Sequence, residues 1–374
     1  MIYFDNGAST YPKPPCVLKA MEEWMRKNGA NPGRSGHRLS MEAAELVYDT
    51  RVAIGKLFGL NKPEQVVIVP NATYGLNTVL LGLFEPGDHI VTTDLEHNSV
   101  LRPLWHLRKN GVEVSVVPVC FEDDEKTVER ILKSIRENTK AIVCTQCSNV
   151  CGRVLPVERL ALRKPRNVLL IVDGAQGAGS LPIDVVKVGV DYYCAPSHKG
   201  LLGPQGGGVI LVNNRPPRPL VFGGTGTESM NPEQPIQLPE RLEGGTVPTP
   251  VCAGMLAAAK YLDRMGVSKI REHKRELTAY VYQELSRLSG VEAYMLPYAQ
   301  HCIGVVPFTV RGQNSGETVE RLDQAGICAR GGLHCSPLFH RRMGTTERGM
   351  VRISFGAFNT AREVDFLIKI LKKL

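Results

Sequence analysis

Short apolar, β-branched runs alternate with helical stretches from about Val66 onward. The intervening segments predict helices over residues 99–109, 126–136 and 156–162. This alternation is typical of a mostly parallel sheet with helices on both faces. The runs that predict strands are VVIV, HIVTT, VEVSVVPV, KAIVCT, VLLIVD, DYYCA and GVILV.

The pattern changes over residues 213–250, where Pro and Gly are frequent and helical periodicity is almost absent. Irregular stretches of this length are often functional. An amphipathic helical region follows over residues 251–288, and a shorter alternation of strands and helices continues to residue 374. We expect this last part to form a second, α+β domain. The first dozen residues predict a strand and loop that join either that domain or the active site.

The composition is that of a globular protein, with 43% apolar and 22% charged residues in 374. This length corresponds to roughly two to three domains. No apolar run approaches the roughly 20 residues that span a bilayer, and Asp5 stands where a signal peptide would carry its apolar core. We therefore expect a cytoplasmic protein. The ten cysteines are too sparse for a disulfide framework, so most are expected to be buried thiols.

The formal net charge is +8, from 45 Lys and Arg against 37 Asp and Glu. The basic residues are dispersed, with no run of more than two consecutive Lys or Arg, as in Arg341-Arg342 and Lys372-Lys373. Binding to a nucleic acid or an anionic membrane needs a clustered basic footprint. The sequence therefore favours a solvated, mildly basic surface over either of these partners.

Two charged residues follow predicted strands. Asp173 ends the run LLIVD, at the carboxyl edge where open α/β sheets bind ligands, although Asp before Gly is also common in turns. Lys199 follows the next strand, 26 residues later. Burying an unpaired ammonium or carboxylate costs several kcal/mol. The two residues are therefore expected to form a salt bridge or to share a ligand, and the sequence leaves both possibilities open.

A possible phosphate site lies in VVIVPNATYGLN, where a strand ends and a helix begins near Ala72 and Thr73. Free N–H groups at a helix start attract anions, although this segment taken alone favours a simple N-cap. The run GGGVILV opens a strand instead of a helix, and the sequence has no Walker A segment. A nicotinamide or P-loop enzyme is therefore disfavoured.

His97 follows another predicted strand, in TTDLEHNSV. A lone histidine there is more often structural than catalytic. However, a phosphate-binding helix start, a strand-end Asp, a strand-end Lys and a nearby His are together the parts that hold pyridoxal 5′-phosphate (PLP).

Ten segments, in order, resemble the class V aminotransferase family of PLP enzymes, and within it the cysteine desulfurases and selenocysteine lyases. The resemblance covers nearly the whole chain. It implies an aspartate aminotransferase-like PLP-dependent transferase of fold type I, with a large domain over residues 15–262 and a small domain from residues 1–14 and 263–374. The segments are YFDNGAST, GRSGHRLS, NATYGLN, LEHNSV, CSNVCG, VDGAQ, SHKGLLGPQGGG, RLEGGTVPT, RGGLHCSP and VRISFGAFNT.

The resemblance implies a role for each cofactor-binding residue. Lys199 would bind the cofactor aldehyde covalently, Asp173 would pair with the pyridine nitrogen, and His97 would stack on the ring. The remaining positions are Gln176 at the phenolic oxygen, Ala72, Thr73 and His198 at the phosphate, and Thr246 at the phosphate of a neighbouring subunit, which implies a homodimer.

The resemblance also implies a substrate side. Arg352 would clamp the substrate carboxylate, a task suited to a planar fork of donors. Cys335 matches the nucleophile that forms a persulfide, and its position 17 residues before Arg352 resembles the group with a short catalytic loop. A reactive thiol needs exposure and a stabilised thiolate, which His334 and Arg330 favour. The other substrate-side positions are His37, Asn149 and Arg330.

Some positions depart from the family pattern. Pro196 stands where a Ser or Thr usually contacts the phosphate, and Ser197, one residue away, could replace that contact. Leu333 stands where some relatives carry a second histidine beside His334. Cys144, Cys147 and Cys151 could suggest a zinc or iron–sulfur site, but the segment lacks a fourth ligand at a usual spacing.

These observations predict a cysteine desulfurase. In this hypothesis Lys199 removes the Cα proton of L-cysteine, Cys335 takes the sulfur, and L-alanine is released. The sulfur would then pass to an acceptor protein or a small thiol. One alternative is another reaction of a class V PLP enzyme, such as transamination, selenocysteine lysis or β-elimination, with Cys335 a bystander. The other is a non-catalytic, metal-binding protein.

Overall fold

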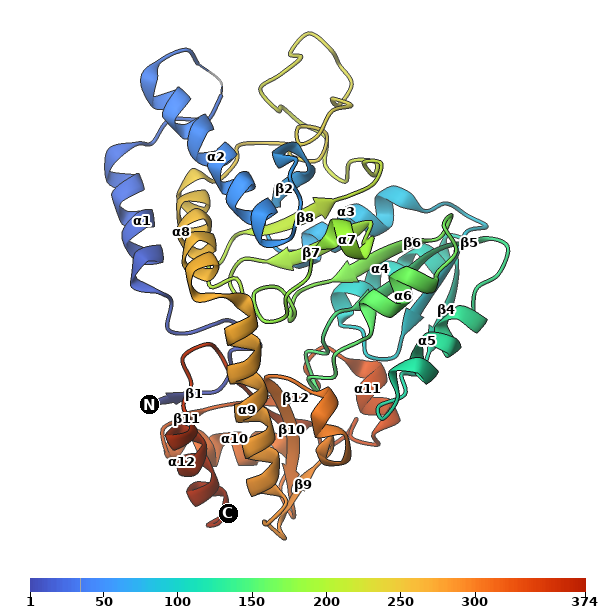
Figure 1. Cartoon of the computed structure of the whole chain (residues 1–374), viewed down its shortest axis with the longest axis vertical. Coiled ribbons are helices and arrows are strands. Elements are labelled where there is room, and N and C mark those ends of the chain that lie inside the picture. Colours follow the sequence, from blue (N-terminus) through green and yellow to red (C-terminus); the bar gives the residue numbers. More distant parts are fainter. Residues whose placement is uncertain (34) are drawn as a thin grey trace.

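The computed structural model describes residues 1–33 and 35–374. Its larger part contains a seven-stranded sheet in which only β8 runs antiparallel to its neighbours. The predicted mostly parallel sheet is thus confirmed (Figure 1). In spatial order the strands are β2 (Val66–Val69), β8 (Gly208–Val212), β7 (Tyr192–Pro196), β6 (Leu169–Asp173), β5 (Thr139–Thr145), β3 (His89–Thr93) and β4 (Glu113–Val117).

Alternate residues of these strands enter two apolar cores, because side chains of a strand point to opposite faces. Val143 and Ile171 pack with α3 (Ala72–Leu83) and α4 (Asn98–Lys109) on one face. Ile142 and Val172 belong to the core of the other face. Helices on that face are α5 (Asp124–Lys133), α6 (Val157–Arg163) and α7 (Val185–Val188).

The segment between β8 and α8 (Thr249–Met265) contains no helix or strand, as its composition predicts. It projects from one end of the molecule, beside α2 (Arg38–Leu57), in Figure 1. Helices α1 (Pro15–Lys27) and α2 both pack against α8. The predicted helical region over residues 251–288 is in fact two helices, because Gly266, at φ +85°, separates α8 from α9 (Val267–Leu285).

The smaller part contains a four-stranded antiparallel sheet in the order β12–β13–β10–β9. The N-terminal strand β1 (Ile2–Tyr3) pairs with β11 (Ile327–Cys328), so the first residues join the small domain. We retain the division into residues 15–262, and 1–14 with 263–374, as a proposal. The other elements are β12 (Arg330–Gly332), β13 (Met350–Ser354), β10 (Val305–Val310), β9 (Val291–Ala293), α10 (Ser315–Gln324), α11 (Pro337–Arg342), α12 (Ala361–Leu371), η1 (Pro63–Gln65) and η2 (Leu296–His301).

Within the described residues, no helix combines the length and the apolar character needed to cross a membrane.

Candidate active site

A pocket lies at the carboxyl ends of the parallel strands, where α3 and α4 begin. This is the edge at which open α/β sheets bind their ligands. Its wall contains side chains from five separate segments of the chain. Eight of the residues predicted from the sequence line it: Ala72, Thr73, His97, Asn149, Asp173, Gln176, His198 and Lys199.

Lys199 and Asp173 face the same pocket without pairing to each other. Among the residues that the structure describes, no ion pair within 4.0 Å joins them, which favours a shared ligand over a salt bridge. Burial lowers the pKa of Lys199 to about 8, and the nearby Asp173 opposes this shift. Burial also raises the pKa of Asp173, whose Oδ1 accepts a hydrogen bond from the Ala175 N–H at 2.8 Å.

His97 both caps α4 and lines the pocket. Its Nδ1 accepts a hydrogen bond from the Ser99 N–H at 3.0 Å, which leaves the proton of the neutral ring on Nε2. Burial, followed by the positive charge of Lys199, lowers the pKa of His97 to about 4. The structural and site interpretations of this residue are therefore compatible, because the cap holds a neutral ring over the pocket.

The start of α3, with Asn71, Ala72 and Thr73, forms one end of the pocket. Gly208, on β8, packs closely against Asn71, the N-cap of α3. A Cβ at position 208 would lie only 3.0 Å from the Asn71 carbonyl carbon, so a larger residue would displace the start of this helix. The buried Nδ1 of His198 has no hydrogen-bond partner among the described residues. Ser197 Oγ, the candidate replacement for the hydroxyl missing at Pro196, donates to backbone carbonyls, at 2.9 Å for Gly207. Its other carbonyl partner is that of Pro204.

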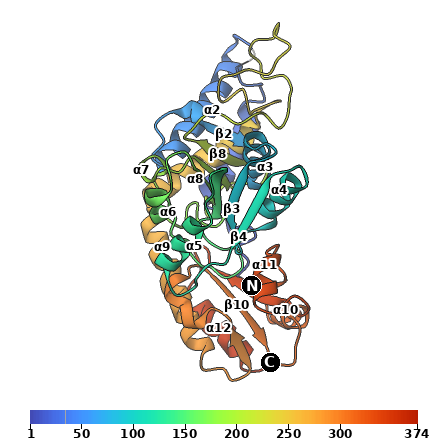
Figure 2. The same cartoon turned by 90° about the vertical axis from the view of Figure 1, so that its right-hand side faces the viewer.

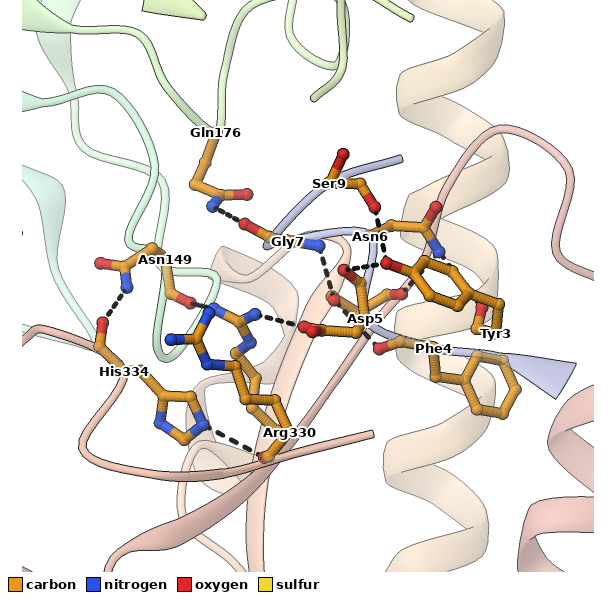
Figure 3. Close-up of polar contacts among 12 residues, drawn as sticks. Tyr3, Phe4, Asp5, Asn6, Gly7, Ser9, Asn149, Gln176, Arg330 and His334 are labelled. Atoms are coloured by element: carbon orange, nitrogen blue, oxygen red, sulfur yellow. Dashed lines mark hydrogen bonds and ion pairs between the residues drawn. The ribbon is translucent and has the colours of Figure 1, made fainter. Parts of the chain in front are cut away.

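Arg352, on β13, bonds to Asp5 and to the pocket residue Asn149, both of which Figure 3 shows together with Arg330. Its Nη2 donates to Asp5 Oδ1 at 2.6 Å, and its Nη1 donates to the Asn149 carbonyl oxygen at 2.9 Å. Its buried Nε has no partner among the described residues. Arg330 lies directly opposite on β12 and is exposed. Asp5 was not predicted to contact this arginine, although it lies within the segment YFDNGAST.

The turn that carries Cys335 is strained and anchored. His334 and Cys335 adopt left-handed backbone conformations, with φ of 51° and 57°, which cost non-glycine residues energy. Asn149 Nδ2 donates to the His334 carbonyl oxygen at 2.6 Å, and Ser336 Oγ donates to Asn149 Oδ1 at 2.8 Å. Cys335 is the exposed one of the ten cysteines. The Asn149 amide thus links the thiol-bearing turn to the pocket.

His334 does not supply the positive charge that we expected beside Cys335. Burial, followed by the charge of Arg352, lowers the pKa of His334 to about 3. With Nε2 3.2 Å from the Arg330 carbonyl oxygen, the neutral ring donates there. The cations near the thiol are instead arginines, and a thiolate at Cys335 would oppose the lowering of the pKa of Arg352.

Comparison with known proteins identifies the family. The sequence profile of the Aminotransferase class-V family matches residues 2–367, nearly the whole chain. The chain belongs to the class V aminotransferase family. It is 30% identical, over 100% of its length and 94% of the relative, to a probable cysteine desulfurase of Methanothermobacter thermautotrophicus. It is also 33% identical to a probable cysteine desulfurase of Mycobacterium leprae, over 98% of this chain and 90% of that protein.

Solved structures of class V proteins have the same architecture. The apo structure of a cysteine desulfurase from Thermococcus onnurineus matches with a TM-score of 0.92 and 31% identity, over 100% of this chain and 94% of that one. A cysteine desulfurase from Escherichia coli matches with a TM-score of 0.86 and 24% identity, over 99% of this chain and 94% of that one, and shows the common fold.

Class V enzymes use PLP, and the residues of this pocket fit that cofactor. PLP carries a phosphate, an aldehyde and a pyridine nitrogen. The pocket offers a helix start beside an unpartnered His198 nitrogen, an amine at Lys199 and a carboxylate at Asp173. Gln176 also lines the pocket, although its Nε2 already donates to the Gly7 carbonyl oxygen at 2.8 Å. The donor set thus provides a partner for each end of the cofactor.

Besides Arg330, Cys335 and Arg352, two further predicted residues lie outside this pocket. His37 caps α2, where its Nδ1 accepts from the Ser40 N–H at 3.2 Å, and Thr246 is exposed in the irregular segment. Gly245, the neighbour of Thr246, lines a different cavity together with Gly33 and residues of α2, and neither His37 nor Thr246 lines the pocket of Lys199. A single chain therefore does not bring them to Lys199.

The three cysteines of CTQCSNVC are buried, and burial raises the pKa of each thiol. Over residues 1–33 and 35–374, no group of three or more His, Cys, Asp or Glu side chains is arranged to hold a metal.

Proposed function

We propose that this class V enzyme is a cysteine desulfurase that converts L-cysteine to L-alanine and takes the sulfur onto Cys335 as a persulfide. One observation carries the proposal. A single amide, that of Asn149, lines the pocket of Lys199 and Asp173 and also anchors the turn of an exposed thiol. Neither transamination nor β-elimination needs a thiol beside the pocket.

PLP, when bound, supplies a ring that accepts electrons from the substrate Cα. The residues of the chain do the rest. We assign the Cα proton to the amine of Lys199, whose pKa of about 8 suits a general base near neutral pH. Asp173 would keep a proton on the pyridine nitrogen, and the neutral His97 would lie against the ring. Ala72, Thr73 and His198 would hold the phosphate, and Gln176 would contact the phenolic oxygen.

We assign the substrate carboxylate to Arg352, with Asn149 and Arg330 beside it. The Cys335 thiolate attacks the substrate sulfur, so that an S–S bond forms as the bond from that sulfur to Cβ breaks. The electron pair of the broken bond stays with the carbon fragment, Cβ takes a proton, and the protonated Lys199 amine returns a proton to Cα. The sulfur is oxidised and the carbon reduced, so no external oxidant is needed. Alanine leaves, and the outer sulfur of the Cys335 persulfide is transferred to an acceptor thiol.

We further propose that the protein acts as a homodimer. Thr246 and His37 would then reach the pocket of the partner subunit, which neither reaches in its own chain. The same end of the molecule carries large exposed apolar side chains, which mark interaction surfaces. They lie on α1, α2 and the irregular segment and include Leu18, Met25, Met41, Tyr48, Phe222, Met230 and Ile236. All ten cysteines are free thiols, which supports a cytoplasmic location.

The proposal is tested by comparing Cys335→Ser with Cys16→Ser, a half-buried cysteine on α1. The PLP-loaded proteins receive L-cysteine and dithiothreitol, and alanine, sulfide and keto acid are measured. We expect Cys335→Ser to lower alanine formation about 100-fold or more, because the attacking nucleophile is lost, whereas Cys16→Ser should match the unchanged chain. Undiminished alanine formation by Cys335→Ser would show that Cys335 is a bystander.

A further inference from the structure

Helix α4 carries a basic, partly aromatic face. Its sequence, NSVLRPLWHLRK, contains no acidic residue. Arg102, Trp105 and Lys109 are exposed and follow one another at spacings of three and four residues, which places them on the same side of a helix. We call these three residues the α4 basic face.

This face leads directly to Cys335. Asn98, the first residue of α4, lies one turn before Arg102, and its N–H donates to the Cys335 carbonyl oxygen at 2.8 Å. With a rise of about 1.5 Å per residue, the line from Asn98 to Lys109 is about 16 Å long. Figure 2 shows α4 next to α11, which begins two residues after Cys335. The exposed thiol therefore lies at one end of the α4 basic face.

The positive charge of this face is not neutralised locally. Among the described residues, neither Arg102 nor Lys109 forms an ion pair with a carboxylate. Arg108 adds a further charge, with its guanidinium carbon 5.9 Å from the centre of the Trp105 ring. Arg102 and Arg330 both contribute to the lowered pKa of His97, so their fields reach the pocket. Exposed Trp and Arg side chains are also the residues most enriched at the centres of protein interfaces.

We propose that the α4 basic face is the docking surface for an acidic protein whose thiol receives sulfur from Cys335. This inference rests on the proposed function. Opposite charges speed the encounter of two proteins and orient them before contact, and a partner held on α4 would bring its cysteine to the thiol at the end of the helix. An RNA could meet the same charges, but its four standard bases carry no thiol to accept sulfur, and the face offers a single aromatic ring for stacking.

The test uses disulfide exchange, which needs neither PLP chemistry nor a persulfide. The probes are three synthetic peptides with one cysteine, activated as mixed disulfides with 2-thiopyridine and flanked by acidic, neutral amide or basic residues. The Cys335 thiolate attacks the peptide sulfur, a protein–peptide disulfide forms, and thiopyridone leaves and is measured. The PLP-loaded protein is used, and the slow reaction of other cysteines is subtracted with Cys335→Ala.

The matched variants reverse two charges in different places. R102E/K109E changes the α4 basic face, and K369E/K373E changes two exposed lysines of the C-terminal segment, on and after α12. In low salt we expect the acidic peptide to react with the unchanged chain at least about tenfold faster than the neutral one. This ratio should fall to about one in R102E/K109E and persist in K369E/K373E. If R102E/K109E does not fold, the milder variant R102Q/K109Q is used in its place.

Binding is followed separately through Trp105, after Trp24→Phe has removed the chain's other tryptophan. An unreactive acidic peptide, with Ser for Cys, should change the Trp105 emission, and 0.5 M salt should abolish the change. The inference is overturned if R102E/K109E keeps the preference for the acidic peptide, if K369E/K373E loses it equally, or if a single-stranded RNA binds in place of the peptide. Absence of alanine formation would instead overturn the proposed function and leave these results standing.

Discussion

The cofactor pocket and the Cys335 turn lie side by side but are built in opposite ways. The pocket sits on the ends of buried strands, and burial lowers the pKa of Lys199 to about 8 and that of His97 to about 4. The turn exposes its thiol, uses two left-handed residues, and depends on a few hydrogen bonds, of which Asn149 donates one and accepts another.

The difference fits what the proposed function requires of each region. Proton transfer at carbon requires groups that are fixed in place and partly stripped of water, which the sheet edge provides. A thiol that collects sulfur inside and delivers it outside has to face solvent and to move. The strained backbone of the turn is held by only a few hydrogen bonds. Breaking one of these hydrogen bonds would let the turn adopt another conformation.

The largest effect is expected from removing the amine of the pocket. Lys199→Ala should lower alanine formation by more than about 10⁴-fold, because one residue acts as covalent anchor and as base. Lys274→Met is the matched control, since burial also lowers the pKa of Lys274 to about 8, but its Nζ donates to Ser180 Oγ at 3.0 Å, without Asp173 beside it. Absorbance of the bound cofactor and alanine release are measured for both. The assignment of Lys199 as anchor and base would be contradicted if Lys274→Met lost the cofactor absorbance and alanine release while Lys199→Ala kept them.

The anchoring of the turn is tested by a graded pair of variants. Asn149→Ala removes both anchoring bonds and should lower alanine formation by about 100-fold, as misplacement of a reacting group does. Ser336→Ala removes one bond and should cost less than about tenfold, in line with about 1 kcal/mol per hydrogen bond. A substrate-side role for Asn149 alone predicts no effect of Ser336→Ala on alanine formation.

The same pair should raise the reactivity of the Cys335 thiol toward a small neutral reagent in protein free of PLP, with Asn149→Ala raising it more. An unchanged rate in both variants would show that these bonds do not hold the turn.

The buried charge of Lys199 predicts a pH dependence. Covalent attachment of PLP needs the unprotonated amine, so the rate in PLP-free protein should rise about tenfold per pH unit up to about pH 8 and then level off. A solvent-exposed lysine would still be protonated there. Asp173 raises the pKa of Lys199 against the effect of burial, so Asp173→Asn should move the curve to lower pH. A midpoint near the ordinary lysine value would contradict the burial of this amine.

The smallest expected effect is on PLP affinity, and it distinguishes the hydroxyl of Thr73 from that of Ser197. Thr73 lines the pocket and Ser197 does not. Thr73→Ala should weaken PLP binding by about fivefold, the loss of one hydrogen bond. Ser197→Ala should leave the affinity unchanged, because its hydroxyl is bound to backbone carbonyls. PLP affinity is measured by titration of PLP-free protein, and an equal loss in both variants would place Ser197 at the phosphate.

Much of the pocket could be predicted from the sequence because it is built on strand ends. Buried strands are apolar, so VLLIVD and DYYCA locate the sheet edge, and the polar residues that follow each run meet there. Asp173 and Lys199 needed no knowledge of distant contacts to be selected as candidates.

The turn could not be predicted in the same way, because its properties arise from contacts distant in sequence. Asn149 binds the His334 carbonyl across 185 residues, and no local pattern reports such a bond. The neutral state of His334 follows from its burial, which a histidine beside an exposed cysteine does not reveal. The α4 basic face was missed because its charges are spaced along a helix, and a search for runs of basic residues passes over them.

The most direct test of the account is to locate the sulfur taken from cysteine. The PLP-loaded protein is mixed with L-cysteine carrying ³⁵S, without reductant, alkylated and digested, and its peptides are analysed by mass and radioactivity. We expect label, one sulfur atom per chain, on the peptide that contains Cys335, with an equal amount of alanine released and no label in Lys199→Ala. Alanine formed in the same amount while the Cys335 peptide stays unlabelled would contradict the account.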